Sequence, residues 1–99
     1  AEDQQTPFSF RLFQNYPNPF NPNTVISYRL PVTSNVTLRV YDIIGNEIAT
    51  LVNEKLSAGE YEVEFSVGRD SSPDIASGIY FYQLKAGSFI QTKKMVLLK

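Results

Sequence analysis

The chain has 99 residues, of which 42% are hydrophobic, and this is enough for one domain with a single core. Its net charge of −1 supplies no basic field for nucleic acid, and no apolar run approaches the roughly 20 residues needed to span a bilayer. Cysteine and histidine are both absent, which excludes a disulfide framework, a thiolate nucleophile and the commonest general base and transition-metal ligand.

The chain begins with a polar segment, residues 1–7, that lacks the basic and apolar regions of a signal peptide. We expect this segment to be a linker from an upstream domain, so that the chain is a piece of a longer protein with one domain over residues 8–99. Residues 8–13 then alternate between two faces, with Phe8, Phe10 and Leu12 on one and Ser9, Arg11 and Phe13 on the other. This period of two predicts a half-buried first strand.

A proline-rich stretch, residues 16–24, follows this first strand. Its prolines, Pro17, Pro19 and Pro22, each hold φ near about −65°, donate no hydrogen bond and push the preceding residue into an extended conformation. The stretch therefore predicts an ordered loop rather than a helix or an inner strand. We expect Phe20 to pin this loop to the core. We also expect four asparagines to bond to neighbouring backbone groups as Asx turns, namely Asn15, Asn18, Asn21 and Asn23.

Beyond the loop, apolar and polar residues alternate along further segments that we predict to be strands. These segments are residues 24–30, 36–41, 48–52, 60–67, 78–84 and 89–99. Gly45 and Asn46 both tolerate positive φ and predict a hairpin turn. We expect residues 53–59 to be a connection, and the polar, proline-bearing residues 68–77 to be an exposed, mobile loop that Ile75 anchors.

Seven short strands without helical periodicity predict an all-β fold, namely an immunoglobulin-like antiparallel β-sandwich. Tyr80 lies two residues into a late strand, as does the tyrosine of the tyrosine corner, whose hydroxyl bonds to backbone a few residues upstream. Tyr82 then takes the core position that holds a cysteine in antibody domains. The segment 78–84 is apolar on both faces at its start, which is typical of a central strand.

Two acidic stretches have spacings that resemble chemical sites. Glu60, Glu62 and Glu64 lie on one face of a predicted strand about 7 Å apart, a spacing that suits paired carboxylates. They share one watery environment, however, and acid–base catalysis needs environments that drive two pKa values apart, so we interpret them as a solvated face. Residues 70–74 resemble the start of a calcium loop, but the positions that require glycine and a bidentate glutamate carry other residues. The sequence predicts no catalytic, cofactor or metal site.

Two segments are candidates for binding a partner. Residues 19–22 match the spacing of a polyproline ligand, although a purely structural loop is the simpler interpretation. The last strand carries Lys93, Lys94 and Lys99 beside the apolar residues 95–98. Lysines on an edge strand usually block unwanted pairing. The functional alternative is a docking strand, which a partner reads through main-chain hydrogen bonds and flanking charges.

Several motifs together resemble one known family. They are Asn15–Pro22, Val40–Gly45, Ala58–Tyr61, Ser77–Tyr82 and Lys93–Lys99. In this order, and running to the last residue, they resemble the C-terminal sorting domain of the bacterial type IX secretion system. The immunoglobulin-like domain of the flagellar hook-capping protein is related and shares much of the strand pattern, but the uninterrupted ending 93–99 favours sorting.

The resemblance implies a non-catalytic, immunoglobulin-like module without a cofactor. Such a module directs an N-terminally attached cargo protein to the type IX outer-membrane translocon and its shuttle or sortase components. The cargo passes through the periplasm to the cell surface or the medium, and a surface sortase commonly cleaves the module off. Cleavage would then fall in the linker before Phe8.

We expect the proline loop and the terminal strand to form one recognition surface, rigid on one side and strand-like on the other. Its residues are Tyr16, Pro17, Asn18, Pro19, Phe20, Asn21, Pro22, Lys93, Lys94, Met95, Val96, Leu97, Leu98 and Lys99. A homodimer through a bare edge strand is a further expectation. The alternative function is an accessory spacer or carbohydrate-binding sandwich of an extracellular enzyme, with Tyr41, Phe13 and Phe81 as its candidate aromatic platform.

Overall fold

The computed structural model describes residues 9–67 and 76–98. Over these residues the chain forms seven strands and no helix, which confirms the predicted all-β fold. The strands are β2 (Arg11–Leu12), β3 (Asn23–Leu30), β4 (Ser34–Tyr41), β5 (Glu47–Leu56), β6 (Gly59–Ser66), β7 (Gly78–Ala86) and β8 (Phe89–Leu97). The loop that we expected Ile75 to anchor, and the calcium-like residues 70–74, lie outside the described residues.

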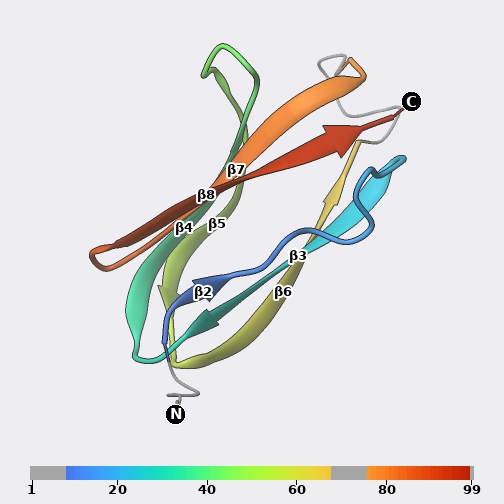
Figure 1. The fold of residues 1–99 in the computed structure, drawn as a ribbon. Helices are drawn as coiled ribbons and strands as arrows, with labels where there is room; N and C mark the ends of the chain where they lie inside the picture. Colours follow the sequence, from blue (N-terminus) through green and yellow to red (C-terminus); the bar gives the residue numbers. More distant parts are fainter. Residues whose placement is uncertain (1–8, 68–75, 99) are drawn as a thin grey trace.

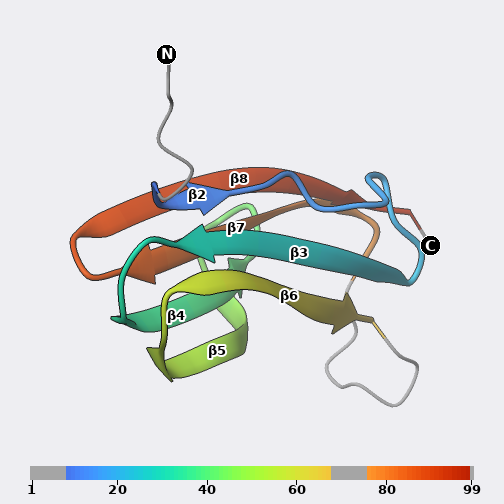
Figure 2. The ribbon, with the colours of Figure 1, turned by 90° about the horizontal axis from the view of Figure 1, so that it is seen from below.

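The strands form two antiparallel sheets that pack face to face (Figures 1 and 2). One sheet has the order β2-β3-β6 and the other the order β5-β4-β7-β8. In constant-type immunoglobulin domains the fourth strand joins the sheet of the first two, whereas here β5 extends the other sheet beside β4. As a result β7 is an inner strand, as its apolar faces predicted, and β8 is an edge strand.

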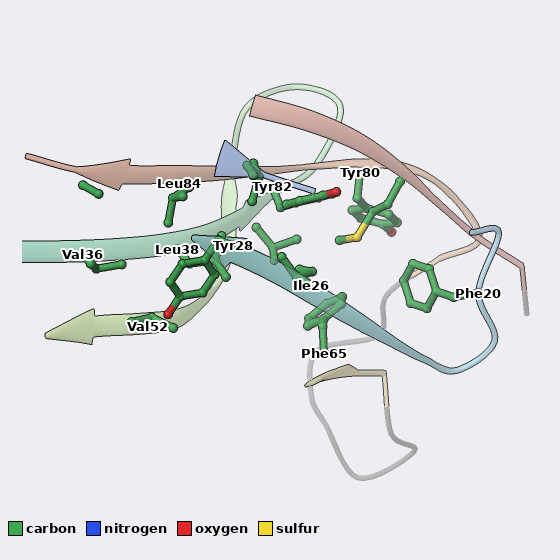
Figure 3. Close-up of a cluster of buried hydrophobic side chains, with 14 of the residues drawn as sticks. Phe20, Ile26, Tyr28, Val36, Leu38, Val52, Phe65, Tyr80, Tyr82 and Leu84 are labelled. Carbon is green, nitrogen blue, oxygen red and sulfur yellow. The ribbon is translucent and has the colours of Figure 1, made fainter. Parts of the chain in front are cut away.

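The core lies between the sheets because alternate side chains of each strand point the same way. Ile26 and Tyr28 of β3 face Leu38 of β4 and Tyr82 of β7 (Figure 3), and each of these side chains is at most 1% exposed. Tyr28 also stacks on Tyr61 of β6, with the ring centroids 5.4 Å apart. Burying side chains of this size stabilises a fold by about 1.5–3 kcal/mol each. The alternation read from the sequence therefore identified the core faces.

The first strand is shorter than predicted. Only two residues form a ladder with β3, although Leu12 is buried and Phe10 packs against the core as expected. Pairing resumes at an isolated bridge between Tyr16 and Val25, one residue out of the register that β2 sets. The extra residue fits because the side chain of Asn15 turns inward and is buried.

The hairpin at Gly45 and Asn46 is present, but its return strand is longer than predicted. Gly45 has a φ of +93°, which glycine adopts at little cost. The return strand runs over Glu47–Leu56 instead of 48–52, so the expected connection 53–59 is wrong, and only two residues separate β5 from β6. The end of β5 is polar and exposed because it lies at a sheet edge, and it therefore lacks the apolar alternation of an inner strand.

Candidate functional site

Buried polar bonds hold the proline loop, residues 16–22. The side-chain amide of Asn15 donates to Thr24 Oγ1 at 2.9 Å and to the carbonyl of Pro17 at 3.2 Å, and Thr24 Oγ1 donates to the same carbonyl at 2.9 Å. Asn15 and Thr24 are 2% and 1% exposed, so little water competes for these bonds. All three X-Pro peptide bonds of the loop are cis. The loop is ordered, as its prolines predicted. Of the four asparagines expected to bond to neighbouring backbone, Asn15 does so at Pro17, whereas Asn18 bonds to the backbone of the distant Val96.

Tyr82 of β7 ties the start of the loop to the four-stranded sheet. Its hydroxyl donates to the carbonyl of Phe13 at 2.7 Å and accepts from the N–H of Asn15 at 2.8 Å. The ring is fully buried, which confirms the predicted core position. Burial raises the pKa of Tyr82 to about 12, with the hydrogen bond from Asn15 acting in the opposite direction. The hydroxyl therefore stays protonated and able to donate at neutral pH.

The tyrosine corner predicted at Tyr80 is also present. The Tyr80 hydroxyl donates to the carbonyl of Ala76, four residues upstream, at 2.6 Å. Burial raises the pKa of Tyr80, the nearby carboxylate of Asp42 raises it further, and the bond to Ala76 opposes both. This bond holds the start of β7 to the backbone at Ala76, which precedes the strand.

Phe20 joins the proline loop to the end of β8 through a parallel bridge with Leu97. The Phe20 N–H donates to the carbonyl of Val96 at 2.9 Å, and the Leu98 N–H donates to the carbonyl of Phe20 at 3.0 Å. The side chain of Asn18 accepts a further bond from the Val96 N–H at 3.0 Å. Figure 1 shows the loop and the end of β8 at the same end of the sandwich. The structure thus brings together the two segments that the sequence singled out separately.

The side chains of the predicted recognition residues divide between core and solvent. Those in the core are Phe20, Met95 and Leu97. Those exposed are Tyr16, Pro17, Asn18, Pro19, Asn21, Pro22, Lys94 and Leu98. Lys93 and Val96 are half-buried, and Lys99 lies outside the described residues. The buried members hold the two segments together, so only the exposed members can offer side chains to a partner.

Tyr16 is the most exposed of the large apolar side chains in the described part of the chain, at 80%. Its backbone is fixed by two bonds to Val25, one in each direction, at 3.0 and 2.9 Å. An aromatic ring on a fixed backbone loses little conformational freedom when a partner covers it.

Sequence reasoning missed one contributor to this surface. The Gln14 side chain donates to the carbonyl of Lys94 at 2.8 Å, although the two residues are 80 positions apart. No local pattern reports a contact between residues so distant in sequence.

The tip of the β4–β5 hairpin was not singled out either, although it is apolar and exposed. Ile43 and Ile44 are 69% and 78% exposed. They are held by Asp42, whose Oδ1 accepts from the N–H groups of Ile44 and Asn46 at 3.1 and 2.8 Å. Beside this tip lies a groove lined in part by Ile79.

The glutamates of β6 are solvated, as interpreted. Glu60, Glu62 and Glu64 are all exposed on the outer face of the three-stranded sheet. Glu60 makes an ion pair with Arg29, with 3.3 Å between Nε and Oε2. Among the residues the structure describes, no group of three or more acidic, histidine or cysteine side chains could hold a metal ion.

The three aromatic residues named as a sugar platform do not form one platform. Phe13 lies on the outer face of the three-stranded sheet, and the guanidinium carbons of Arg11 and Arg29 lie 4.8 and 5.6 Å from its ring centroid. These two guanidinium groups therefore make cation–π contacts with the Phe13 ring. Tyr41 and Phe81 are register partners on the other sheet, where both are half-buried.

The fold and this surface define a class of protein: a small immunoglobulin-like sandwich with a fixed surface patch that joins an early loop to its last strand. The chain matches the protein-family model described as the secretion system C-terminal sorting domain over residues 14–98, and it belongs to that family. It is a C-terminal sorting signal of type IX secretion. Domains of this family are generally non-catalytic, and they are exported to the cell surface or the extracellular space. No curated protein and no solved structure matches the chain. No described helix could span a membrane.

Proposed function

We propose that the proline loop and the end of β8 form the surface by which the type IX translocon, with its shuttle or sortase components, recognises this domain. The bridge between Phe20 and Leu97 is the observation that carries the proposal, because it makes one surface of two distant segments. Since buried hydrogen bonds from Asn15 and Thr24 already order this surface, binding costs little conformational entropy.

Tyr16 is the anchor of the proposed contact. Exposed aromatic side chains on fixed backbone are frequent hot spots of protein interfaces. Lys94 and Leu98 lie on the β8 side of the surface and are also exposed. The cation of Lys94 adds an electrostatic preference for an acidic partner surface, which acts mainly on the rate of association.

The cargo protein is attached upstream in this proposal. Residues 1–7 are the linker and residues 8–99 the sorting domain, which has no catalytic role of its own. A surface sortase cleaves in the linker before Phe8, after the cargo has crossed the periplasm and the outer membrane. The polar composition of residues 1–7 supports this assignment, because a protease needs an extended, accessible segment.

The test attaches residues 1–99 to a fluorescent reporter that carries a signal peptide, in a host with a type IX system. We expect fluorescence outside the cell, and its loss in a translocon-deficient host. Tyr16→Ala should reduce export by about thirtyfold, the effect on affinity of losing a hot-spot contact of about 2 kcal/mol. Lys94→Glu should reduce it less. Val32→Ala, which truncates a side chain 56% exposed in the turn between β3 and β4, is the matched control.

Each variant domain is purified to confirm that its unfolding temperature is unchanged. Normal export of the Tyr16→Ala reporter, or an equal loss with Val32→Ala, would remove the loop from the recognition surface. Deleting residues 95–99 is a poorer test because Met95 and Leu97 belong to the core. If the unaltered fusion is folded but stays in the periplasm, the accessory-module alternative gains weight, and pull-down on polysaccharides tests it.

A further inference from the structure

The free edge of β8 falls into two parts with different protection. β8 pairs only with β7 in its sheet, without a register shift from Gly78–Leu97 to Ala86–Phe89. The backbone groups of Val96 point away from β7, since they bond to the proline loop. By strand alternation, the backbone groups of Ile90 and Thr92 also point to the free edge.

The chain itself covers the last part of this edge. The Gln14 side chain donates to the carbonyl of Lys94. The Val96 N–H donates to the side chain of Asn18, and the Val96 carbonyl accepts from the N–H of Phe20. Behind this cover, the inward side chains of β8 are the fully buried Met95 and Leu97. A second strand cannot pair there unless it displaces the proline loop.

Among the residues that the structure describes, the first part of the edge has no such hydrogen-bonded cover, although β2 lies close to β8. Among the described residues, no hydrogen bond is made by the backbone groups of Ile90 or Thr92 that point to the edge. Here the inward positions of β8 are Phe89, Gln91 and Lys93, which are half-buried, and the ring of Phe89 stacks on that of Phe10 with the centroids 5.2 Å apart. Between the apolar residues Phe89 and Met95, the inner face of β8 is therefore polar, and this is where the edge backbone of Thr92 makes no bond to a described residue.

We propose that Lys93, supported by Gln91, prevents another strand from adding to the open part of β8 and so keeps the folded domain monomeric at this edge. An added strand would extend the sandwich over the inward side chains, and the ammonium group of Lys93 would lose water without gaining a counter-ion. The strand most available in solution is β8 of a second copy of this chain. Lys93 and the proline loop together close the whole edge.

Lys93 and Lys94 are adjacent in the sequence but lie on opposite faces of β8. Lys94 points to the outer face and is exposed, so an added strand would leave its ammonium group in water. The two lysines therefore have different roles: Lys93 protects the edge, and Lys94 is available to a partner.

The experiment compares Lys93→Val with Lys94→Val, which remove the same charge and add the same side chain on opposite faces of β8. Light scattering after size-exclusion chromatography should give the monomer mass for the unaltered domain and for Lys94→Val, and about twice that mass for Lys93→Val at high concentration. Amide exchange at Ile90 and Thr92 should slow by about tenfold in Lys93→Val alone, because the new strand pair protects these N–H groups.

A folded Lys93→Val that stays monomeric would overturn the inference. Equal association of both variants would also do so, because it would report added apolar surface rather than edge protection. Association of the unaltered domain with protected Ile90 and Thr92 amides would show that the edge is not guarded at all. If Lys93→Val is poorly folded, Lys93→Thr and Lys94→Thr remove the charge without an apolar side chain, and the same comparison decides.

Discussion

Replacing Tyr82 by phenylalanine removes one hydroxyl from the core and leaves the ring in place. The carbonyl of Phe13 and the N–H of Asn15, 2.7 and 2.8 Å from that hydroxyl, both lose their partner. A buried polar group without a partner costs about 1–3 kcal/mol, and the partly buried carbonyl of Phe13 recovers some of this from water. We therefore expect the free energy of unfolding to fall by about 2–3 kcal/mol, or the unfolding temperature by roughly 10–20 °C for a domain of this size.

Urea denaturation followed by circular dichroism measures this loss, and the slope of the transition should stay unchanged. Tyr80→Phe is the matched control, since it removes a single hydrogen bond, to the partly buried carbonyl of Ala76. Its expected cost is about 1 kcal/mol. If Tyr82→Phe destabilises the domain no more than Tyr80→Phe does, Tyr82 does not fix the loop through its two hydrogen bonds.

Two further predictions concern the core. Raising the pH from about 10 to 12 should lower the free energy of unfolding. Tyrosines in the unfolded chain ionise near pH 10, whereas burial raises the pKa values of Tyr28 and Tyr82 to about 12 in the folded state. Stability is fully present below pH 10, and urea titrations at successive pH values should show the decline; a flat profile would contradict it. Phe20→Ala should lower the free energy of unfolding by about 3–5 kcal/mol, because it removes a ring that is 2% exposed. A small change in the urea midpoint would show that this ring does not belong to the core.

The parts of the fold that follow from local pattern were predictable. Alternation along β3, β4 and β6 located their core faces because a strand repeats every two residues. The tyrosine corner at Tyr80 and the hairpin at Gly45 were also predictable, because each depends on residues only a few positions apart in the sequence. The same local reasoning placed Phe20 in the core, where a large apolar side chain in a rigid loop has few other stable positions.

The remaining errors have physical causes. The predicted range of β5 is too short because the end of this strand is polar and faces solvent at a sheet edge. A strand in that position lacks the apolar alternation from which strands are predicted. The predicted first strand extends beyond β2 on both sides because alternation reports which side chains face the core, as that of Phe10 does, but not whether the backbone pairs with a neighbouring strand. The bridge from Phe20 to Leu97, on which the candidate site depends, joins residues with no shared local pattern. The different roles of Lys93 and Lys94 need the position of the loop, which the sequence does not reveal.

The bridge between the proline loop and β8 also bears on the order of events in folding. Asn18 and Val96 bond to each other across 78 positions of sequence, so their contact closes a long segment of chain and is entropically costly until the strands between them have paired. A chain that ends before Val96 lacks this contact. If a partner binds across the bridge, as we propose, its binding depends on completion of the domain as well as on the identity of the domain, and a single binding event would serve as both address and quality check.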